Sequence, residues 1–148
     1  MKILLVEDNP IDVKLVQAAF RRQTDETIRL ETTEDLQTGL AALQSLGPFD
    51  LILLDLTLPD SAGIATFRRI NAAAPDTAVI VATGTDDEKI ALEAMHLGAQ
   101  DYLVKGRFDL HSLIRTCRYA IERKKNEREI KAANTAMARH ERVLTITL

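Results

Sequence analysis

The chain has 148 residues, of which 46% are hydrophobic and 28% are charged, and this composition is that of one soluble globular domain. Its single cysteine, Cys117, excludes an internal disulfide and fits a reducing compartment. The net charge of -3 gives no overall attraction to nucleic acid or to an anionic membrane.

The chain opens with a short buried strand, predicted over Lys2 to Val6. Its apolar run is too short for a signal peptide or a membrane span, so we expect a cytoplasmic protein. Asn9 and Pro10 predict the start of a helix, because they supply an N-cap followed by proline at the first helical position. The apolar residues of that helix share one face: Val13, Val16 and Phe20.

An edge strand is predicted over Thr27 to Glu31, where apolar and polar residues alternate. The helix that follows ends at Gly47-Pro48 and has leucines at helical spacing: Leu36, Leu40 and Leu43. The next strand, Leu51 to Asp55, is an unbroken apolar run that suits a parallel sheet covered on both faces. Asp55 then lies at the carboxyl end of this strand, where ligands collect in open α/β sheets.

Two further strands are predicted, over Ala78 to Ala82 and over Asp101 to Val104. A helix precedes the first of them, closes near Pro75 and turns three residues inward: Ile64, Phe67 and Ile70. A helix over Asp86 to Leu97 lies between the two strands and ends at Gly98, and its apolar face is predicted to contain Ile90, Ala94 and Leu97. Helical signals then run from Asp109 almost to the end of the chain.

Five strands that alternate with five helices predict an α/β fold, a doubly wound five-stranded parallel sheet with right-handed crossovers. The length and the number of units favour the flavodoxin-like strand order 2-1-3-4-5, with an extended last helix. In that order the first and third strands are neighbours, so the acids that follow the first strand meet Asp55.

Three carboxylates are therefore expected to converge, those of Glu7, Asp8 and Asp55. Two like charges about 4 Å apart repel by about 4 kcal/mol at an effective dielectric of 20, so the cluster needs a cation. Carboxylate oxygens suit Mg²⁺, and the same loops carry no histidine or cysteine that would favour zinc.

A carboxylate at a metal site can also act as a nucleophile and form an aspartyl-phosphate. A metal ion and an ammonium group would neutralise the phosphoryl oxygens, and a hydroxyl would donate a hydrogen bond to them. Lys105 and Thr83, at the ends of two further strands, are the residue types that this chemistry requires.

With Glu7-Asp8, Asp55, Thr83 and Lys105 in this order and spacing, the chain resembles the receiver domain of two-component response regulators over about Lys2 to Arg123. The resemblance implies that Asp55 is the phosphoacceptor, which takes a phosphoryl group from a histidine kinase or a phosphotransfer protein. Beyond phosphorylating and dephosphorylating itself, such a domain is not an enzyme.

The resemblance also assigns roles to the surrounding residues. Asp8 and Asp55 would bind Mg²⁺ through their side chains and Thr57 through its main-chain carbonyl, while Glu7 would act mainly through water. Thr83 would move toward the phosphoryl group, the rotamer of Tyr102 would follow it, and Lys105 would contact the phosphoryl oxygens.

The chain departs from the family pattern at two glycines. Gly106 follows Lys105 where the family usually has proline with a cis bond, so we expect a trans bond and a looser loop. Gly84 replaces a common alanine and should leave access to Asp55 open. The segments DYLVKG and RYAIERKK resemble a receiver subset tethered to sensory, kinase or GGDEF-type cyclase domains.

The last helix is expected to have two parts. Its first part has an inward stripe of Leu110, Leu113, Ile114, Cys117 and Ile121, and then comes a charged run from Glu122 to Glu129, typical of a solvated face. Beyond that run, heptad positions are filled by Ile130, Ala133, Met137, His140 and Leu144. We expect residues 1–123 to form the receiver domain and residues 124–148 to form a weak dimer seam, a linker to an output domain, or a frayed helix end.

The expected partners are a histidine kinase or phosphotransfer protein and a second copy of the chain. A homodimer would use either the last helix or the surface formed by the fourth helix, fifth strand and fifth helix. No helix-turn-helix follows and the basic run Arg123 to Lys125 is offset by glutamates, so no direct contact with nucleic acid is predicted. The alternative function is a phosphatase-type hydrolase with an aspartyl-phosphate intermediate, although Thr57 stands where dehalogenase-like enzymes need a second aspartate.

Overall fold

The computed structural model describes residues 1–22, 28–107 and 109–147, with side chains described to residue 142. Five parallel strands form one sheet in the order β2-β1-β3-β6-β7, which is the flavodoxin-like order predicted from the sequence. The strands are β1 (Lys2–Val6), β2 (Arg29–Thr33), β3 (Leu51–Asp55), β6 (Ala78–Thr83) and β7 (Asp101–Val104).

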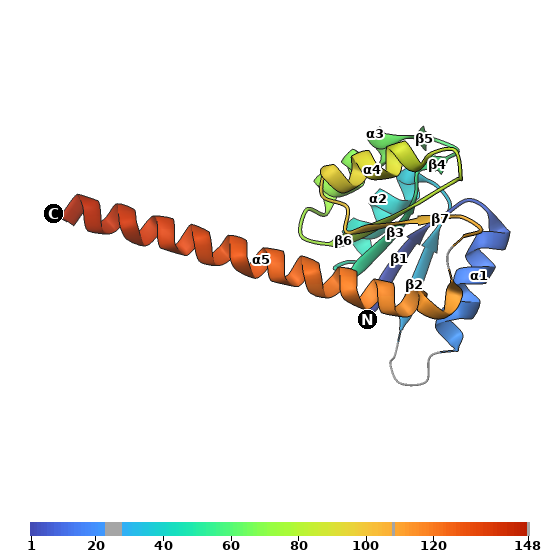
Figure 1. Cartoon of the computed structure of the whole chain (residues 1–148), viewed down its shortest axis with the longest axis horizontal. Helices are drawn as coiled ribbons and strands as arrows, with labels where there is room; N and C mark the ends of the chain where they lie inside the picture. Colours follow the sequence, from blue (N-terminus) through green and yellow to red (C-terminus); the bar gives the residue numbers. More distant parts are fainter. Residues whose placement is uncertain (23–27, 108, 148) are drawn as a thin grey trace.

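Helices cover both faces of this sheet (Figure 1). One face packs against α1 (Pro10–Arg21) and the first half of α5 (Leu110–Thr147). The other face packs against α2 (Leu36–Ser45), α3 (Ile64–Ala73) and α4 (Glu88–His96). The alternating fold class predicted from the sequence is therefore confirmed.

The central strand β3 shows why its sequence is wholly apolar. Side chains alternate between the two faces of a strand. Leu51 and Leu53 accordingly pack in the cluster under α1 and α5, whereas Ile52 and Leu54 pack in the cluster under the other three helices. Each buried leucine or isoleucine contributes about 1.5 to 3 kcal/mol relative to an exposed one, so β3 joins the two halves of the core.

Local capping sets the loop that follows β1. The Asn9 side chain accepts a hydrogen bond from the backbone N–H of Ile11 at 2.9 Å, and Pro10 occupies the first turn of α1, as predicted. The loop between β1 and α1 therefore contains only three residues, Glu7, Asp8 and Asn9. This short connection holds two acids at the edge of the sheet.

Three elements have bounds that differ from the prediction. Strand β2 spans Arg29–Thr33 rather than Thr27 to Glu31, of which Thr27 lies outside the described residues. Parallel pairing with β1, from Lys2 opposite Arg29 to Val6 opposite Thr33, fixes the register that the alternating pattern left ambiguous. Helix α4 begins at Glu88, and strand β6 extends one residue further than predicted, to Thr83.

The prediction that Leu97 lies on the buried face of α4 was wrong. This residue is the C-cap of the helix and is 40% exposed, whereas Ala91 and Ala94 are buried. A short antiparallel pair, β4 (Thr57–Leu58) with β5 (Ser61–Ala62), was also not predicted and occupies the loop after Asp55.

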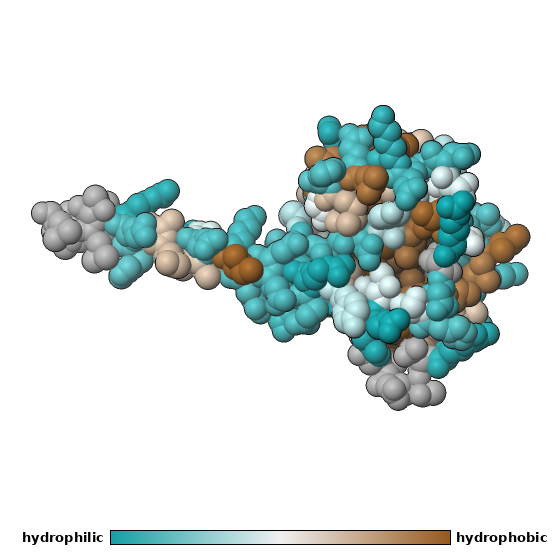
Figure 2. Space-filling view, in the orientation of Figure 1, coloured by the Kyte–Doolittle hydropathy of each residue, from teal (hydrophilic) through white to brown (hydrophobic). Residues whose placement is uncertain are grey.

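Helix α5 has 38 residues and continues far beyond the sheet (Figure 1). Its predicted inward stripe is confirmed, because Leu113, Ile114 and Cys117 are buried while Leu110 and Ile121 are partly buried. Every described side chain from Lys125 onward is exposed. Figure 2 shows that the surface of this projecting part is mostly hydrophilic with a few small hydrophobic patches.

Three charged residues at the start of the projection contact the domain. Arg123 donates hydrogen bonds to Gln100, Gln100 donates to Glu127, and Arg128 donates to the main-chain oxygen of Asp76 at 2.9 Å. Apart from the partly buried Lys124, the charged run is exposed, as predicted. Part of it also attaches α5 to the edge of the sheet opposite Asp55.

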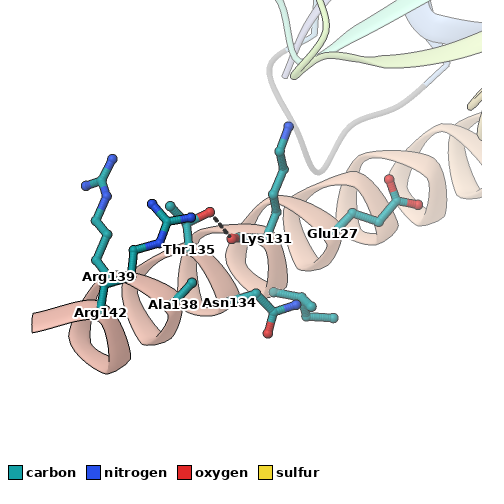
Figure 3. A pocket seen from close by; sticks show the side chains of 8 residues that line it. Glu127, Lys131, Asn134, Thr135, Ala138, Arg139 and Arg142 are labelled. Atoms are coloured by element: carbon teal, nitrogen blue, oxygen red, sulfur yellow. Dashed lines mark hydrogen bonds between the residues drawn. The ribbon is translucent and has the colours of Figure 1, made fainter. Parts of the chain in front are cut away.

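One depression on the outer part of α5 is not bordered by the rest of the domain. This shallow depression is lined by residues of this helix alone (Figure 3): Glu127, Ile130, Lys131, Asn134, Thr135, Ala138, Arg139 and Arg142. Such a depression is the side of a helix and not an enclosed binding site. Among the described helices, none has an apolar stretch long enough to cross a membrane.

Candidate functional site

Acidic side chains meet at the carboxyl edge of the sheet. Glu7 follows β1, Asp55 ends the neighbouring strand β3, and one carboxylate oxygen each of Glu7, Asp8 and Asp55 lie within 4.8 Å of one another. Glu7 is 3% exposed and Asp55 is 4% exposed, whereas Asp8 is exposed. The predicted convergence of these three acids is confirmed.

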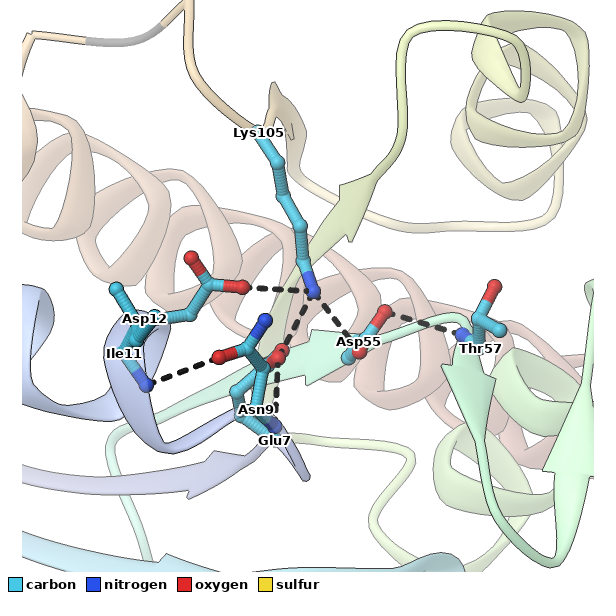
Figure 4. A network of polar contacts seen from close by, with 7 residues as sticks. All are labelled: Glu7, Asn9, Ile11, Asp12, Asp55, Thr57 and Lys105. Carbon is cyan, nitrogen blue, oxygen red and sulfur yellow. Dashed lines mark hydrogen bonds and ion pairs between the residues drawn. The ribbon is translucent and has the colours of Figure 1, made fainter.

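Lys105 lies at the centre of the site (Figure 4). Its Nζ is 2.8 Å from Glu7 Oε1, 3.0 Å from Asp55 Oδ2 and 3.2 Å from Asp12 Oδ2. Its backbone N–H donates to the carbonyl of Thr83 at 2.8 Å, which anchors the residue to the end of β6. Burial alone would lower the pKa of Lys105, but hydrogen bonds and charges from Glu7 and Asp55 outweigh burial and raise it.

The pKa of Glu7 reflects its burial among other charged groups. Burial raises the pKa of Glu7 from 4.5 to about 7, although the hydrogen bond from Lys105 opposes this change. The negative charge of Asp55 adds to the increase. One ammonium therefore does not fully compensate the buried carboxylates, and the all-oxygen donor set fits a divalent cation such as Mg²⁺.

Asp55 is oriented by the segment that follows it. Its Oδ1 accepts a hydrogen bond from the backbone N–H of Thr57 at 3.0 Å, and its Oδ2 faces Lys105. The Thr57 side chain is exposed. The two oxygens of Asp55 thus have different partners, and the carboxylate has a fixed orientation.

Thr83 is the last residue of β6 and is 2% exposed. Its hydroxyl is buried and has no hydrogen-bond partner. Buried polar groups in proteins are nearly always paired, so an unpaired hydroxyl close to the acidic cluster indicates a missing partner. An anionic group bound beside Asp55 and Lys105 would be a suitable acceptor.

Tyr102 lies on β7 and contacts the start of α4. Its hydroxyl donates to Glu88 Oε1 at 3.1 Å, at the start of α4, and this hydrogen bond to a carboxylate raises the pKa of Tyr102. Tyr102 therefore contacts α4 and not the acidic cluster in this structure.

The two glycines lie in open parts of their loops, and the predicted trans bond before Gly106 is confirmed. Gly106 has φ of 81°, in the left-handed region that favours glycine, and the peptide bond before it is trans. A methyl group at Gly84 would meet only Asp87 Oδ2, at 3.8 Å, so the loop after Thr83 is open at this point.

Asp12 and Glu88 were not predicted as part of the site. Asp12 lies in the first turn of α1, and it could have been noted because this turn directly follows the loop that carries Glu7 and Asp8. Glu88 gave no such signal, because exposed acids are common at helix starts and only the fold brings this one to Tyr102.

Comparison with known proteins agrees with this geometry. The sequence model of the family described as "Response regulator receiver domain" matches residues 3–118. The uncharacterized transcriptional regulatory protein YhcZ of Bacillus subtilis is 32% identical over 107 residues, which cover 71% of this chain and 48% of that protein.

Solved structures give the same result. A response regulator receiver domain protein from Clostridium thermocellum aligns with a TM-score of 0.72 at 27% identity, covering 84% of this chain and 96% of that one. The receiver domain of NtrX from Brucella abortus aligns with a TM-score of 0.69 at 29% identity, covering 81% and 98% respectively. This chain spans less than half the length of the curated relatives YhcZ, AruR and CtrA. None of these matches supports the phosphatase alternative.

Proposed function

The chain belongs to the response regulator receiver domain family, and we propose that Asp55 accepts a phosphoryl group from a histidine of a partner kinase or phosphotransfer protein. The observation that carries the proposal is the buried Asp55 carboxylate at the end of β3, with Lys105 Nζ 3.0 Å away. In the transfer, an Asp55 oxygen bonds to phosphorus as the phosphorus–nitrogen bond of the phosphohistidine breaks, and the electron pair of that bond stays on the imidazole.

The cation of this site is proposed to be Mg²⁺. Asp8 and Asp55 would hold it through their carboxylates, Thr57 through its main-chain carbonyl, and Glu7 through water. The support is the cluster of three carboxylates, whose oxygens lie within 4.8 Å of one another. When bound, Mg²⁺ would offset the charge of the phosphoryl oxygens.

Lys105 and Thr83 would stabilise the phosphoryl group. The Lys105 ammonium would exchange a carboxylate partner for a phosphoryl oxygen, and the Thr83 hydroxyl would donate a hydrogen bond to another. The support is the short distance between Lys105 and Asp55 together with the unpaired buried hydroxyl of Thr83. Both groups would act as charge shifts during the transfer.

Tyr102 would transmit the change to the surface formed by α4, β7 and α5. Phosphorylation can bias two states only if some group contacts the phosphoryl group differently in each state, and Thr83 is such a group. Tyr102 follows Thr83 in this proposal, and its present hydrogen bond to Glu88 would be given up.

Residues 1–123 are proposed to be the receiver domain and residues 124–148 a helical extension toward an output domain. A homodimer would form through the α4, β7 and α5 surface or through the extension. Exposed apolar side chains support both surfaces, with Leu92 and Tyr119 on the first and Ile130 and Met137 on the second. The heptad residue Leu144 lies outside the described side chains.

The domain would work in the cytoplasm as a switch and turn over no small molecule beyond its own phosphorylation and dephosphorylation. A tethered sensory, kinase or cyclase domain, or a separate partner, would receive the signal. Several relatives are named as transcriptional regulators, but this chain spans only part of each of them, and we propose no direct contact of residues 1–148 with DNA.

The test is the intact mass of the protein after incubation with acetyl phosphate, with and without Mg²⁺. Wild type should gain one phosphoryl group only with Mg²⁺, Asp55→Asn should gain none, and Asp86→Asn, an exposed acid after β6, should behave as wild type. Phosphorylation of Asp55→Asn, or no phosphorylation of wild type under donor excess and rapid quenching, would contradict the proposal.

A further inference from the structure

Three carboxylates surround the Lys105 ammonium. An ammonium group has three donors and no acceptor, and the three acids around Nζ come from three separate segments: Glu7 after β1, Asp12 on α1 and Asp55 on β3 (Figure 4). Glu7 and Asp55 accept hydrogen bonds from Nζ, and Asp12 forms an ion pair with it at 3.2 Å. A phosphoryl group must therefore compete with three carboxylates for the ammonium.

The three contacts are not equivalent. The side chains of Glu7 and Asp55 are each 4% exposed, and their distances to Nζ are 2.8 and 3.0 Å. The side chain of Asp12 is 29% exposed and lies 3.2 Å from Nζ. Water can solvate Asp12 when it leaves Lys105, whereas it reaches the other two carboxylates poorly, so the Asp12 contact is the least costly to break.

Asp12 also stands apart from the metal cluster. That cluster comprises Glu7, Asp8 and Asp55, and Asp12 touches the site only through Lys105. With Asp12 included, four carboxylates oppose one ammonium, and the formal charge of the site is -4 + 1 = -3. A bound divalent cation would not remove the competition, because Asp12 would still pair with the ammonium that the phosphoryl group needs.

On the basis of the proposed phosphorylation of Asp55, we infer that Asp12 is a positioning residue for Lys105. Asp12 holds Lys105 in the unphosphorylated state and competes with the phosphoryl group for the Lys105 ammonium. Lys105 exchanges Asp12 for a phosphoryl oxygen when Asp55 is phosphorylated. Asp12 thereby slows the phosphorylation of Asp55, because the phosphoryl group has to displace its carboxylate from the Lys105 ammonium.

The test compares the initial rates of phosphorylation of wild type, Asp12→Asn and Asp12→Glu by acetyl phosphate with saturating Mg²⁺. Asp12→Asn should react about two to five times faster, the factor expected when a partly exposed ion pair is removed. Asp12→Glu should return the rate toward that of wild type. The matched control is Asp76→Asn, which removes the same charge from the opposite edge of the sheet and should leave the rate unchanged.

A second readout separates this role from a structural one. The acceleration should shrink at high salt, because screening weakens the electrostatic competition between Asp12 and the phosphoryl group. An unchanged or lower rate in Asp12→Asn, or equal acceleration in Asp76→Asn, would overturn the inference. If wild type is not phosphorylated at Asp55 at all, the proposed function fails instead, and the two failures are distinct.

Discussion

Arg123 and Gln100 are joined at two points. The Nη2 of Arg123 donates to the main-chain oxygen of Gln100 at 3.0 Å, and its Nε donates to the side-chain Oε1 at 3.3 Å. The Gln100 amide in turn donates to both oxygens of Glu127, at 3.0 and 3.1 Å. Gln100 is only 8% exposed, so this buried side chain connects two successive turns of α5 to the residue that precedes β7.

Replacing Gln100 by alanine should loosen α5 beyond the domain. Two side-chain contacts are lost, but Arg123 is about half exposed, so the local free energy should change by only about 0.2 to 1 kcal/mol. Amide hydrogen exchange over residues 122–130 should become about two to five times faster. Lys125→Ala, an exposed residue of the same turn, is the control, and equal exchange in the two variants would show that Gln100 does not hold the helix.

The stability of the metal-free protein should fall as pH rises. The pKa of Glu7 in the folded state, about 7, exceeds the ordinary value of 4.5. Glu7 therefore contributes stability that is fully present below pH 4.5 and is lost as the pH rises through about 7. Relative to Glu7→Gln, wild type should lose about 2 to 3 kcal/mol of unfolding free energy between pH 5 and pH 8, measured by urea denaturation with EDTA. Parallel pH profiles of the two proteins would contradict this expectation.

Removing Asp8 should weaken Mg²⁺ binding. Asp8 is the exposed member of the acidic cluster, and its loss leaves two carboxylates, both of which already contact Lys105. Asp8→Asn should lower the Mg²⁺ affinity at least about tenfold in calorimetric titration, since even indirect partners of metal ligands contribute that much. Glu129→Gln, an exposed acid on α5, should bind Mg²⁺ as wild type does. An unchanged affinity in Asp8→Asn would remove Asp8 from the ligand set.

Cys117 should be inert in the folded protein. The residue is fully buried on the side of α5 that packs on the sheet, and burial raises the pKa of its thiol from 9.0 to about 12. The lower thiolate fraction alone should slow its reaction with a disulfide reagent at pH 8 by about a thousandfold relative to the chain unfolded in urea. Fast labelling in native buffer would show that α5 separates readily from the sheet.

Asp60 should stabilise the start of α2, although it lies far from that helix in the sequence. Its two carboxylate oxygens accept the backbone N–H groups of Leu36 and Gln37, each at 2.9 Å, and these bonds lower the pKa of Asp60. The stabilisation by Asp60 is present above the ordinary carboxyl pKa of 3.8. It is lost as the pH falls through the lower pKa that Asp60 has in the folded protein. Asp60→Asn should melt at a lower temperature than wild type at pH 7, with the difference narrowing in acid. Equal melting temperatures at pH 7 would show that Asp35 alone caps the helix.

The fold and the acidic cluster could be predicted because they depend on local patterns. An apolar run that ends in an acid, as at Asp55, marks both a buried strand and its carboxyl edge. Parallel topology then brings Glu7 and Asp8 to that edge without further information. Thr83 could also be named from its place at the end of a strand, but only the structure shows that its hydroxyl is buried and unpaired.

The contacts that could not be predicted are those made by side chains on helix surfaces. Asp12 reaches Lys105, and Glu88 reaches Tyr102, only because loops of a given length set the positions of α1 and α4. The error at Leu97 has a related cause, because helical spacing extends the apolar face past the point where α4 ends. The Gln100 contacts were hidden because a charged run on a helix usually indicates a solvated face.

Among the described contacts, Arg128 makes the outermost hydrogen bond between α5 and the domain, and the helix continues to Thr147. At 1.5 Å per residue, these 147 - 128 = 19 residues form a rigid arm about 28 Å long, pivoted at the rim of the sheet. A tilt of only about 11° at the pivot moves the tip by about 5.4 Å, the length of one helical turn. Small rotations of α5 at Arg123 and Arg128 are thus converted into a sideways displacement of several ångströms at the far end of the helix.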